Sequence, residues 1–583
     1  MARRAIHLLV IAVVGVSMLL GSTAGALGQE VTSERLLHAD QEPHNWLMYY
    51  GNYQGWRYSP LQQINTTNVQ RLAVKWTFRT GSGDENFQVT PLVIDGVMYL
   101  TNQRNEIFAL QAETGKILWR YTYFQVEFSP QMPGRVWGRA QHRGVAVAGG
   151  KVFLATQDAY LVALDAKSGE VLWKTQAGDY EEGHGFTSPP LIVKDKAILG
   201  IFTGEKPTRG FIDAYDLETG KRVWRFYTVP GPGEPGHETW GGDSWQYGCG
   251  PAWLPGTYDA ELHLVYMGIG NPCPMYSGDE RPGDNLYTDA IVALDPETGA
   301  LRWHFQVIPH DRWDYDAANE LVLVDMAAVD GKLVKALLQA NKNGYIYAVD
   351  RTDGRLLYAK PFVARITWTP GLEATGRPLL GLVPTPKGEV ICPSAYGAKS
   401  WNHLAYHPER RQVYIPASDM CQRMTQVQME PRRGAMYYGG EGRTLSEGAN
   451  GMLEALDVQT GEIRWQYRSK YPMMSSVLAT GGGLVLTGES RETPWPSLPR
   501  TGNGSGRLTL VQAIVAPPLP MPWAASSTSP CHQDGAGWRR EGSPGPSPRW
   551  RMRPAGARSS SSVCLRSETV WATRGARGRR QRQ

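Results

Sequence analysis

The chain has 583 residues, of which 42% are hydrophobic and 20% are charged, and its formal net charge is +5. The length would allow several domains, but one repeated phrase runs through most of the chain and favours a single large one. The positive charge belongs to residues 491–583, so it is poor evidence for a nucleic-acid partner, and we expect none.

The first 28 residues are predicted to be a signal peptide. Arg3 and Arg4 precede an apolar run over residues 8–20, and Ala24-Gly-Ala26 offers a small-residue cleavage site. The run is too short to span a bilayer comfortably, although an uncleaved anchor stays an alternative. Export would place the protein in the periplasm, an oxidising compartment in which disulfides persist.

Six segments of the chain repeat nearly the same phrase. In each, a strand ends near Ala-x-Asp, a tight turn carries Thr-Gly or a similar pair, and a new strand runs to an aromatic residue. Gly suits a turn that needs a positive φ, and Asp and Thr can bond the turn's own backbone, so each segment is predicted to be a β-hairpin. The segments are 109–119, 163–173, 214–224, 293–303, 348–358 and 455–465.

The spacing of these hairpins predicts a β-propeller over residues 29–490. Successive repeats start 54, 51, 79, 55 and 107 residues apart; the short intervals suit one four-stranded sheet each and the last suits two. Alternating apolar segments such as 91–100 and 151–155 supply further strands. We expect an all-β fold of seven to eight blades, in which the repeat aromatics fill the wedges between neighbours and are scaffold rather than site.

Polar residues follow three of the predicted strands. Asp314 and Asp316 are two residues apart, so in an extended segment both would face one point. Glu205 ends a glycine-rich turn, and Asn271 follows another strand. Carboxylate and amide oxygens are ligands of hard cations, and a carboxylate beside the cation can act as a general base. Each residue alone is more often a solvated turn residue, so it is the set that indicates a site.

Residues 491–583 differ in composition from the rest of the chain. They hold 15 Arg, no Lys and four acidic residues, a net charge of +11, which leaves −6 for residues 1–490. Pro, Ser, Gly and Arg dominate, and the repeat phrase does not return. A disordered basic tail, which could adhere to an acidic surface, and a shift of the reading frame both explain this, and we favour the frameshift.

Seven short motifs follow one another along residues 45–489: WRYSPL at 56–61, DAKSG at 165–169, RVWRFY at 222–227, GNP at 270–272, HDRWDYD at 310–316, DRTDG at 350–354 and CPS at 392–394. In kind and order they resemble the alcohol dehydrogenases that depend on pyrroloquinoline quinone (PQQ), the family that includes the methanol dehydrogenases. That resemblance implies an eight-bladed propeller with the quinone and a metal ion on its central axis, and the oxidation of a primary alcohol to an aldehyde.

The resemblance also implies the metal site. Glu205, Asn271 and Asp314 match the metal ligands, and Asp314 also matches the base that removes the hydroxyl proton of the alcohol. Asp316 resembles the additional ligand of the lanthanide-dependent branch, since the calcium branch has a small residue at that position. Because three carboxylates balance a trivalent ion better than a divalent one, a lanthanide is favoured and calcium is the alternative.

The cofactor contacts are implied in the same way. Trp253 matches the indole on which the flat quinone stacks. Lys342 matches the catalytic cation beside the reactive quinone oxygens, and with the metal it would polarise the carbonyl that accepts electrons. Arg143 and Thr156 match polar contacts to the cofactor's carboxylates.

Four positions depart from the family's pattern. Gln88 stands where many members have Glu, Ser400 where Asn is frequent, and Pro251 where Thr often contacts the quinone. Gln88 keeps a polar group that can still contact the cofactor, and Ser400 is also predicted to be a cofactor contact. The adjacent pair of cysteines that caps the quinone is absent, and Trp137 is the residue expected to cover the ring instead.

The cysteines bear on disulfides and on electron transfer. Cys392 and Cys421 match a disulfide of the family, whereas Cys249 and Cys273 have no assigned role. No Cys-x-x-Cys-His sequence occurs, so no c-type haem is expected and electrons should leave to a separate acceptor, a soluble cytochrome c. The substrate class is a small alcohol, and assembly is left open, with a homodimer as one alternative.

The end of the chain departs most from the family. After residues 482–488 the family continues with a final repeat and closing strands, and only residues 514–518 resemble that text here. We therefore expect an incomplete last blade, whose sheet edges would be exposed. The alternative to an active enzyme is a non-catalytic propeller scaffold or an inactive, truncated copy of such an enzyme.

Overall fold

The computed structural model describes residues 30–81, 87–123, 141–327, 332–488 and 512–515. The chain divides into two compact units, and all described residues belong to the first, Met1–Leu519. The regular structure described in that unit is almost entirely β, which confirms the predicted all-β class. Its helices are short: α2 (Ser33–Leu37) and the 3-10 turns Ala39–Gln41, Val69–Arg71, Tyr180–Glu182, His237–Thr239 and Ser244–Tyr247.

Five four-stranded sheets have their strands side by side in chain order. Their strands are β2 (Leu92–Ile94), β3 (Val97–Thr101), β4 (Ile107–Gln111) and β5 (Ile117–Tyr121); β6 (Ala146–Ala148), β7 (Lys151–Ala155), β8 (Tyr160–Asp165) and β9 (Val171–Gln176); β10 (Leu191–Val193), β11 (Lys196–Gly200), β12 (Phe211–Asp216) and β13 (Arg222–Tyr227); β14 (Thr257–Asp259), β15 (Leu264–Gly268), β16 (Ala290–Leu294) and β17 (Leu301–Gln306); and β18 (Val322–Ala327), β19 (Leu333–Ala340), β20 (Tyr345–Asp350) and β21 (Leu356–Pro361).

Two further sheets complete the described strands. One contains β22 (Glu389–Ile391), β23 (Ala405–His407), β24 (Gln412–Gln426), β25 (Gly440–Asp457) and β26 (Ile463–Ser469), with β22 and β23 both paired to the long strand β24. The other contains β1 (Tyr58–Ser59), β27 (Leu478–Thr480), β28 (Leu484–Thr487) and β29 (Gln512–Val515). In it β1 pairs with β27 in parallel, with Tyr58 opposite Ala479.

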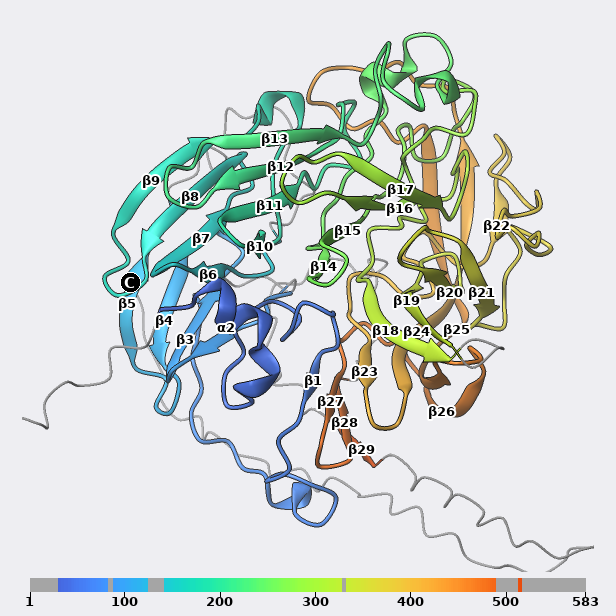
Figure 1. Cartoon of the computed structure of the whole chain (residues 1–583). Coiled ribbons are helices and arrows are strands. Elements are labelled where there is room, and N and C mark those ends of the chain that lie inside the picture. The colour runs from blue at the N-terminus through green and yellow to red at the C-terminus, as the bar shows by residue number, and fades with distance from the viewer. Residues whose placement is uncertain (1–29, 82–86, 124–140, 328–331, 489–511, 516–583) are drawn as a thin grey trace, which may run out of the picture. The chain divides into compact units, whose positions relative to one another are not determined.

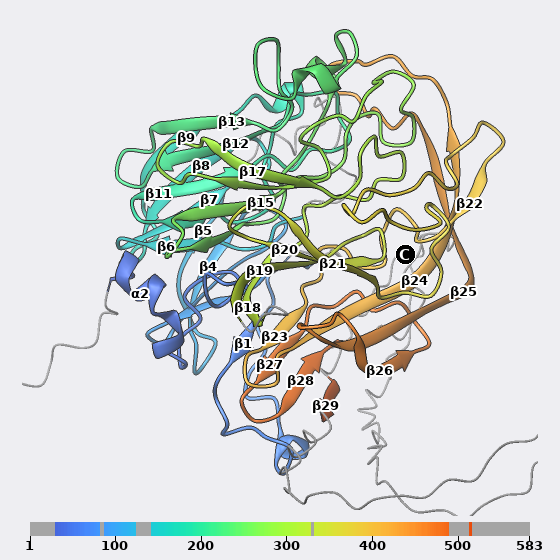
Figure 2. The ribbon, with the colours of Figure 1, turned by 45° about the vertical axis from the view of Figure 1, so that its right-hand side comes forward.

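Within this unit the sheets follow one another around a common centre. Figure 1 shows this order from β2–β5 (blue) through β10–β13 (teal) and β18–β21 (yellow-green) to β27–β29 (orange-red), and the turned view in Figure 2 agrees. Because β1 lies beside β27, a strand from near the N-terminus joins the sheet that holds the last described strands. Radial antiparallel sheets of this kind are the arrangement of a β-propeller.

All six repeat segments form hairpins, as predicted. Each pairs its Ala with its aromatic residue, for example Ala163 with Trp173, and each shifts register immediately afterwards. In the second repeat the Asp165 carboxylate accepts the backbone N–H groups of Lys167 and Ser168 at 3.0 and 2.8 Å. Gly169 in the same turn has a φ of 75°, a conformation that glycine adopts without strain.

Five of the six repeat aromatics hydrogen-bond to the next sheet, which confirms their scaffold role. Trp119 donates its indole N–H to Ala166 O at 3.0 Å and covers Gly169, where a Cβ would lie 2.6 Å from the ring. Trp76 makes the same contact with the first hairpin, donating to Ala112 O at 3.2 Å, although residues 72–80 around it form no strand. Equivalent bonds run from Trp173 to Leu217 O, Trp224 to Pro296 O, Trp303 to Arg351 O and Tyr358 to Val458 O.

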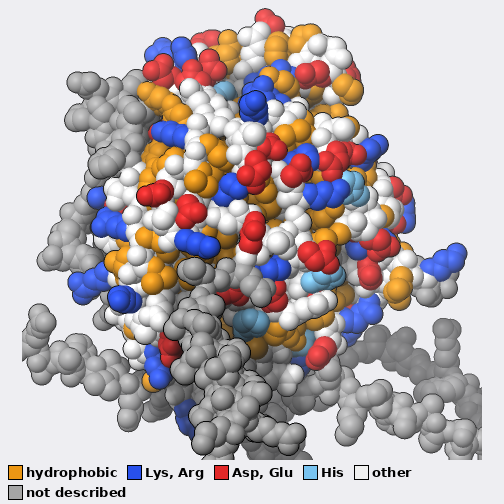
Figure 3. Space-filling view, turned by 60° about the vertical axis from the view of Figure 1, so that its left-hand side comes forward, with side chains coloured by type: hydrophobic (Ala, Val, Ile, Leu, Met, Phe, Trp, Pro, Cys, Tyr) orange, Lys and Arg blue, Asp and Glu red, His pale blue; other side chains and the backbone are white. Residues whose placement is uncertain are grey.

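The charged side chains on the surface are mixed in sign. On the face shown in Figure 3, basic and acidic groups alternate over the described residues. Ion pairs among the described residues include Lys194 with Glu297 at 2.9 Å and Arg302 with Asp295 at 2.6 Å. Exposed pairs of this kind contribute little to stability individually.

Candidate active site

The sequence-predicted site residues occupy equivalent positions in successive sheets. Thr156, Glu205, Asn271 and Lys342 each follow the second strand of a sheet, namely β7, β11, β15 and β19. Others precede the first strand of a sheet: Gln88 before β2, Arg143 before β6, Trp253 before β14, and Asp314 and Asp316 before β18. Ser400 precedes β23, which pairs antiparallel with β24. In an antiparallel sheet the second strand ends where the first begins, so all of these residues belong to one end of the ring.

The acidic segment 310–316 follows β17 and turns back on itself. The fully buried Asp311 carboxylate accepts the backbone N–H groups of Trp313 at 2.9 Å and Tyr315 at 3.1 Å. Asp314 has a φ of 65°, in the left-handed region. The extended segment expected from the sequence is therefore wrong, because hydrogen bonds to Asp311 close a turn at that position.

One ammonium group nevertheless brings the two predicted carboxylates together. Lys342 Nζ lies 2.6 Å from Asp316 Oδ2 and 3.4 Å from Asp314 Oδ2, and it donates to Asp314 O at 2.9 Å. Gly397 packs so closely on the lysine stem that a Cβ there would lie 2.5 Å from Lys342 Cγ. The position of the ammonium group is thus fixed by packing and by both aspartates.

The electrostatics of this group favour a further cation. Burial raises the pKa of Asp314 well above its ordinary value; the Lys342 ammonium opposes the shift, and the charges of Asp316 and Glu205 add to it. Burial would lower the pKa of Lys342, but Asp314 and Asp316 outweigh it and the pKa is raised. Asp314 and Asp316 therefore share one ammonium, and the charge of Glu205 also acts on Asp314, an environment that a metal ion would balance.

Asn271 is oriented by bonds to its amide nitrogen. Its Nδ2 donates to Gly204 O at 2.7 Å and to Pro272 O at 3.1 Å, and its backbone N–H donates to Asp316 Oδ1 at 3.0 Å. Because both N–H bonds of the amide are used, the ligand that this side chain can offer is Oδ1. A Cβ at Gly204 would collide with that oxygen, so glycine is required beside it.

Trp253 and Arg143 lie next to this group. Trp253 Nε1 donates to Asp316 Oδ1 at 3.2 Å, and the Arg143 guanidinium carbon stands 5.0 Å from the centroid of the Trp253 ring. Arg143 is 4% exposed and bonds the uncharged acceptors Thr187 and Gln141, while its Nε has no partner among the described residues. A buried guanidinium of this kind is suited to an anionic ligand such as the cofactor's carboxylates.

Thr156, Ser400 and Gln88 are placed at the same end, but their cofactor role stays a prediction. The Thr156 hydroxyl donates to Asp158 at 2.5 Å. The Ser400 carbonyl accepts Asn319 Nδ2 at 2.9 Å and Lys399 Nζ at 3.1 Å. Gln88 is 7% exposed, and the neighbouring Thr90 donates its backbone N–H to Arg143 O at 3.1 Å, which ties this segment to Arg143.

A second acidic group in the described residues is not this site. The possible ligand atoms of Glu42, His44 and Asp95 all lie within 4.8 Å of one another. Those of Glu205, Asp314 and Asp316 do not meet this distance. However, Arg35 already neutralises that group, at 2.6 Å from Glu42 and 3.1 Å from Asp95. It is therefore an ion-pair network at the N-terminal edge of the described chain.

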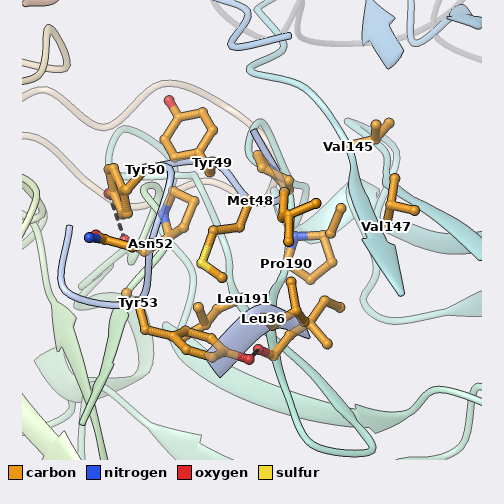
Figure 4. Close-up of a pocket in the computed structure, with 16 residues that line it drawn as sticks. Leu36, Met48, Tyr49, Tyr50, Asn52, Tyr53, Val145, Val147, Pro190 and Leu191 are labelled. Carbon is orange, nitrogen blue, oxygen red and sulfur yellow. Dashed lines mark hydrogen bonds between the residues drawn. The ribbon is translucent and has the colours of Figure 1, made fainter. Parts of the chain in front are cut away.

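An apolar pocket lies elsewhere, between α2 and the strands β6 and β10 (Figure 4). Its polar groups are satisfied: the Tyr50 hydroxyl donates to Pro255 O at 2.8 Å and the Tyr53 hydroxyl to Ile192 O at 2.7 Å. Leu36, Met48 and neighbouring aliphatic side chains form the rest of its wall. None of the predicted site residues lines it.

The structure contains two disulfides in the described residues. Cys392–Cys421, with a Cα–Cα distance of 4.3 Å, was predicted and is confirmed. Cys249–Cys273, with a Cα–Cα distance of 5.3 Å, was not predicted, although both cysteines lie within four residues of a predicted site residue, Trp253 or Asn271. Trp137, expected to cover the quinone, lies outside the described residues.

Fold and site together define a β-propeller with a polar centre suited to a hard cation and a flat, anionic cofactor. Residues 46–361 match the PQQ family, which is described as glucose/ethanol/alcohol dehydrogenase, beta-propeller domain. The chain belongs to this family of PQQ-dependent alcohol dehydrogenases and is, by that membership, an enzyme. The family of the outer membrane protein assembly factor BamB also matches, over residues 288–503.

Individual relatives agree with this membership. The chain is 36% identical to the quinoprotein alcohol dehydrogenase PedH of Pseudomonas putida, over 80% of this chain and 82% of that protein. It is 34% identical to the lanthanide-dependent methanol dehydrogenase of Methylacidiphilum fumariolicum, over 80% of each chain. A solved structure of a europium-containing methanol dehydrogenase matches with a TM-score of 0.72 at 34% identity, covering 78% of this chain and 83% of that one. Among the described residues no helix has the length and apolarity to cross a bilayer.

Proposed function

We propose that this chain oxidises a small primary alcohol to the aldehyde with PQQ and one bound metal ion, and passes the electrons to a soluble cytochrome c. The observation that carries the proposal is the meeting of Asp314, Asp316 and Lys342 beside the Trp253 indole, at the distances given above. A scaffold has no need of a buried and a half-buried carboxylate that share one buried lysine. The relatives named above, which are alcohol and methanol dehydrogenases, support the substrate class.

The metal is proposed to be held by Glu205, Asn271 Oδ1, Asp314 and Asp316. Four oxygen donors of which three are carboxylates suit a hard ion, and the third carboxylate favours a trivalent lanthanide over calcium. Relatives described as lanthanide-dependent and europium-containing support that preference. Calcium is the alternative.

Each residue of the proposed site would then have a separate role in the oxidation of the alcohol. When bound, PQQ supplies the two-electron acceptor and the metal ion polarises its reactive carbonyl. Asp314 accepts the hydroxyl proton of the alcohol, a task that suits a carboxylate placed beside the bound cation. Lys342 presents its ammonium group to the developing negative charge, and the buried side of Trp253 excludes water from one face of the site.

The direct test uses the purified full-length chain reconstituted with PQQ and either LaCl3 or CaCl2. Reduction of an artificial electron acceptor and formation of aldehyde are followed with methanol, ethanol and a longer primary alcohol. Activity that needs both PQQ and a metal supports the proposal. Binding of PQQ and metal without turnover of any alcohol would favour the non-catalytic alternative.

Lys342→Met is expected to lower kcat by about 30-fold, because it removes a charge-assisted hydrogen bond worth about 2 kcal/mol at the reacting carbonyl. The methionine keeps most of the stem that packs on Gly397. Because Asp314 and Asp316 lose the ammonium that they share, the melting temperature is also expected to fall, and kcat is compared on folded, metal-loaded protein. Steady-state kinetics with ethanol measure the effect, and Lys335→Met, which removes an exposed Lys335–Glu261 pair, is the control. A K342M enzyme with wild-type kcat would contradict the role of the ammonium group.

We further propose eight blades, of which the last is incomplete in this chain. Trp76 bonds to the first sheet as the other repeat aromatics bond to theirs, so residues 72–80 take the place of the outermost strand of a preceding blade. The indole N–H of Trp465 is buried without a partner in the described residues. Its partner would be the repeat turn after β29, and that turn is missing from the sequence pattern.

The Trp465 indole, unpartnered among the described residues, and the missing repeat turn favour the second candidate function, an inactive copy of such an enzyme. The composition of residues 491–583 supports a shift of the reading frame as its origin. Resequencing the gene beyond codon 490 tests this: a single-base change that restores a repeat phrase with Thr-Gly and Trp would support the frameshift. If resequencing returns the same codons, a genuine basic tail is the remaining explanation.

We also propose that residues 1–28 are a signal peptide and that the mature chain is periplasmic. The basic start, short apolar run and small-residue site support this. Mass spectrometry of the N-terminus after expression with the native leader, together with cell fractionation, tests it. An intact Met1 in the cytoplasmic fraction would exclude the assignment.

A further inference from the structure

The Cys249–Cys273 disulfide packs against the segment that carries Glu205. Both cysteines are buried, at 0% and 2% exposure. Cys273 Sγ is 3.1 Å from Gly204 O, and Cys249 Sγ is 3.0 Å from Lys206 O. The disulfide therefore contacts the carbonyl groups on either side of Glu205.

The backbone around the disulfide also holds the Asn271 segment. Gly250 donates its N–H to Asn271 O at 3.1 Å, and Cys273 donates its N–H to Gly248 O at 3.2 Å. The oxygen that Cys273 Sγ touches, Gly204 O, is the same one that accepts Asn271 Nδ2 at 2.7 Å. One crosslink thus contacts the segments of both Glu205 and Asn271, which come from the ends of different sheets.

Tyr437 connects this crosslink to a third part of the chain. It packs with Cys249 and Cys273 in one buried apolar cluster, and its backbone N–H donates to Glu205 O at 2.7 Å. The main-chain oxygen of Glu205 is thus held from the side of the disulfide, while its side chain affects the pKa of Asp314.

We propose that Cys249–Cys273 is a positioning disulfide for metal binding, which holds Glu205 and Asn271 close to Asp314 and Asp316. This inference rests on the proposed function. Like charges repel, so the segments that carry these carboxylates tend to separate, and a crosslink below them opposes that movement before the metal binds. Ligands that are held in place by the groups behind them bind metal more tightly than ligands that must be gathered.

Cys392–Cys421 provides a matched control. Its cysteines are 29 residues apart in sequence, against 24 for Cys249–Cys273, so removing either disulfide should change the entropy of the unfolded chain by a similar amount. It joins the end of β22 to β24, and neither strand carries a proposed metal ligand. A purely structural role predicts the same result for both disulfides.

The experiment titrates LaCl3 into the PQQ-loaded full-length chain by calorimetry, with the melting temperature of each variant measured in parallel. Cys249→Ser/Cys273→Ser is expected to raise the Kd for La3+ by about tenfold or more, while Cys392→Ser/Cys421→Ser leaves it within about threefold. Equal Kd values for the two variants at similar melting temperatures would overturn the inference.

A double-mutant cycle with Asn271→Ala separates positioning from general damage. If the disulfide acts through Asn271, its removal costs less La3+ affinity in the N271A background than in the wild-type background. Full additivity counts against action through Asn271. If the wild-type chain itself binds no La3+ in the presence of PQQ, it is the proposed metal site that fails, which is a distinct result.

Discussion

Asp314→Asn should lower kcat for ethanol by about 1,000-fold, the scale expected when a general base is removed. The amide keeps the shape of the side chain and an oxygen that can still ligate a metal, but it cannot accept the hydroxyl proton. Removing the carboxylate also removes a partner of Lys342, which retains Asp316 at 2.6 Å. We therefore expect the variant to bind PQQ and metal and to lose turnover.

Steady-state kinetics on PQQ- and metal-loaded protein measure this effect, with the metal content of each sample checked by elemental analysis. Asp279→Asn is the control, because this exposed aspartate pairs with Arg312 near the same segment and should leave kcat unchanged. A D314N enzyme that is fully loaded and retains kcat within about threefold of wild type would show that the base is another group.

Asp316→Ala should selectively remove the response to lanthanides. The change deletes one of the three proposed carboxylate ligands, so the affinity for La3+ is expected to fall by about 100-fold or more, and that for Ca2+ by much less. It also removes the acceptor of the Trp253 and Asn271 N–H groups, which are bonded to Asp316 Oδ1 at 3.2 and 3.0 Å.

Asp316→Asn separates the two contributions, because the amide oxygen can still accept these hydrogen bonds without the charge. If charge decides metal choice, Asn and Ala variants lose La3+ affinity alike, as measured by calorimetry on PQQ-loaded protein. Parallel losses of La3+ and Ca2+ affinity in both variants would contradict the assignment of Asp316 as the residue that selects the trivalent ion.

The hairpins could be predicted from sequence because their causes are local. A turn such as that of Asp165 and Gly169 is determined by neighbouring residues, and the same phrase occurs six times. The parallel pairing of β1 with β27 places Tyr58 opposite Ala479, more than four hundred residues away in sequence, and no local sequence pattern predicts it. The left-handed turn at Asp314 was missed for a related reason, since it depends on the burial of Asp311.

The residues of the candidate site also divide into those that local sequence indicates and those that it does not. Composition and spacing indicate Asp314, Asp316 and Asn271 as oxygen donors, whereas Lys342 became a candidate only through the resemblance to a family, because one lysine in a turn carries no signal. The Cys249–Cys273 pairing could not be deduced, since pairing depends on which loops meet in the fold. Its closeness in sequence to Trp253 and Asn271 is the signal that was present and unused.

The central claim is that Glu205, Asn271, Asp314 and Asp316 hold one metal ion beside PQQ. A crystal structure of the full chain grown with PQQ and LaCl3, with data collected for anomalous scattering, tests it most directly. The account predicts one strong anomalous peak with oxygens of all four residues at about 2.3–2.6 Å. A peak at Glu42 and Asp95, or none within reach of Asp314 in a PQQ-bound protein, would contradict it.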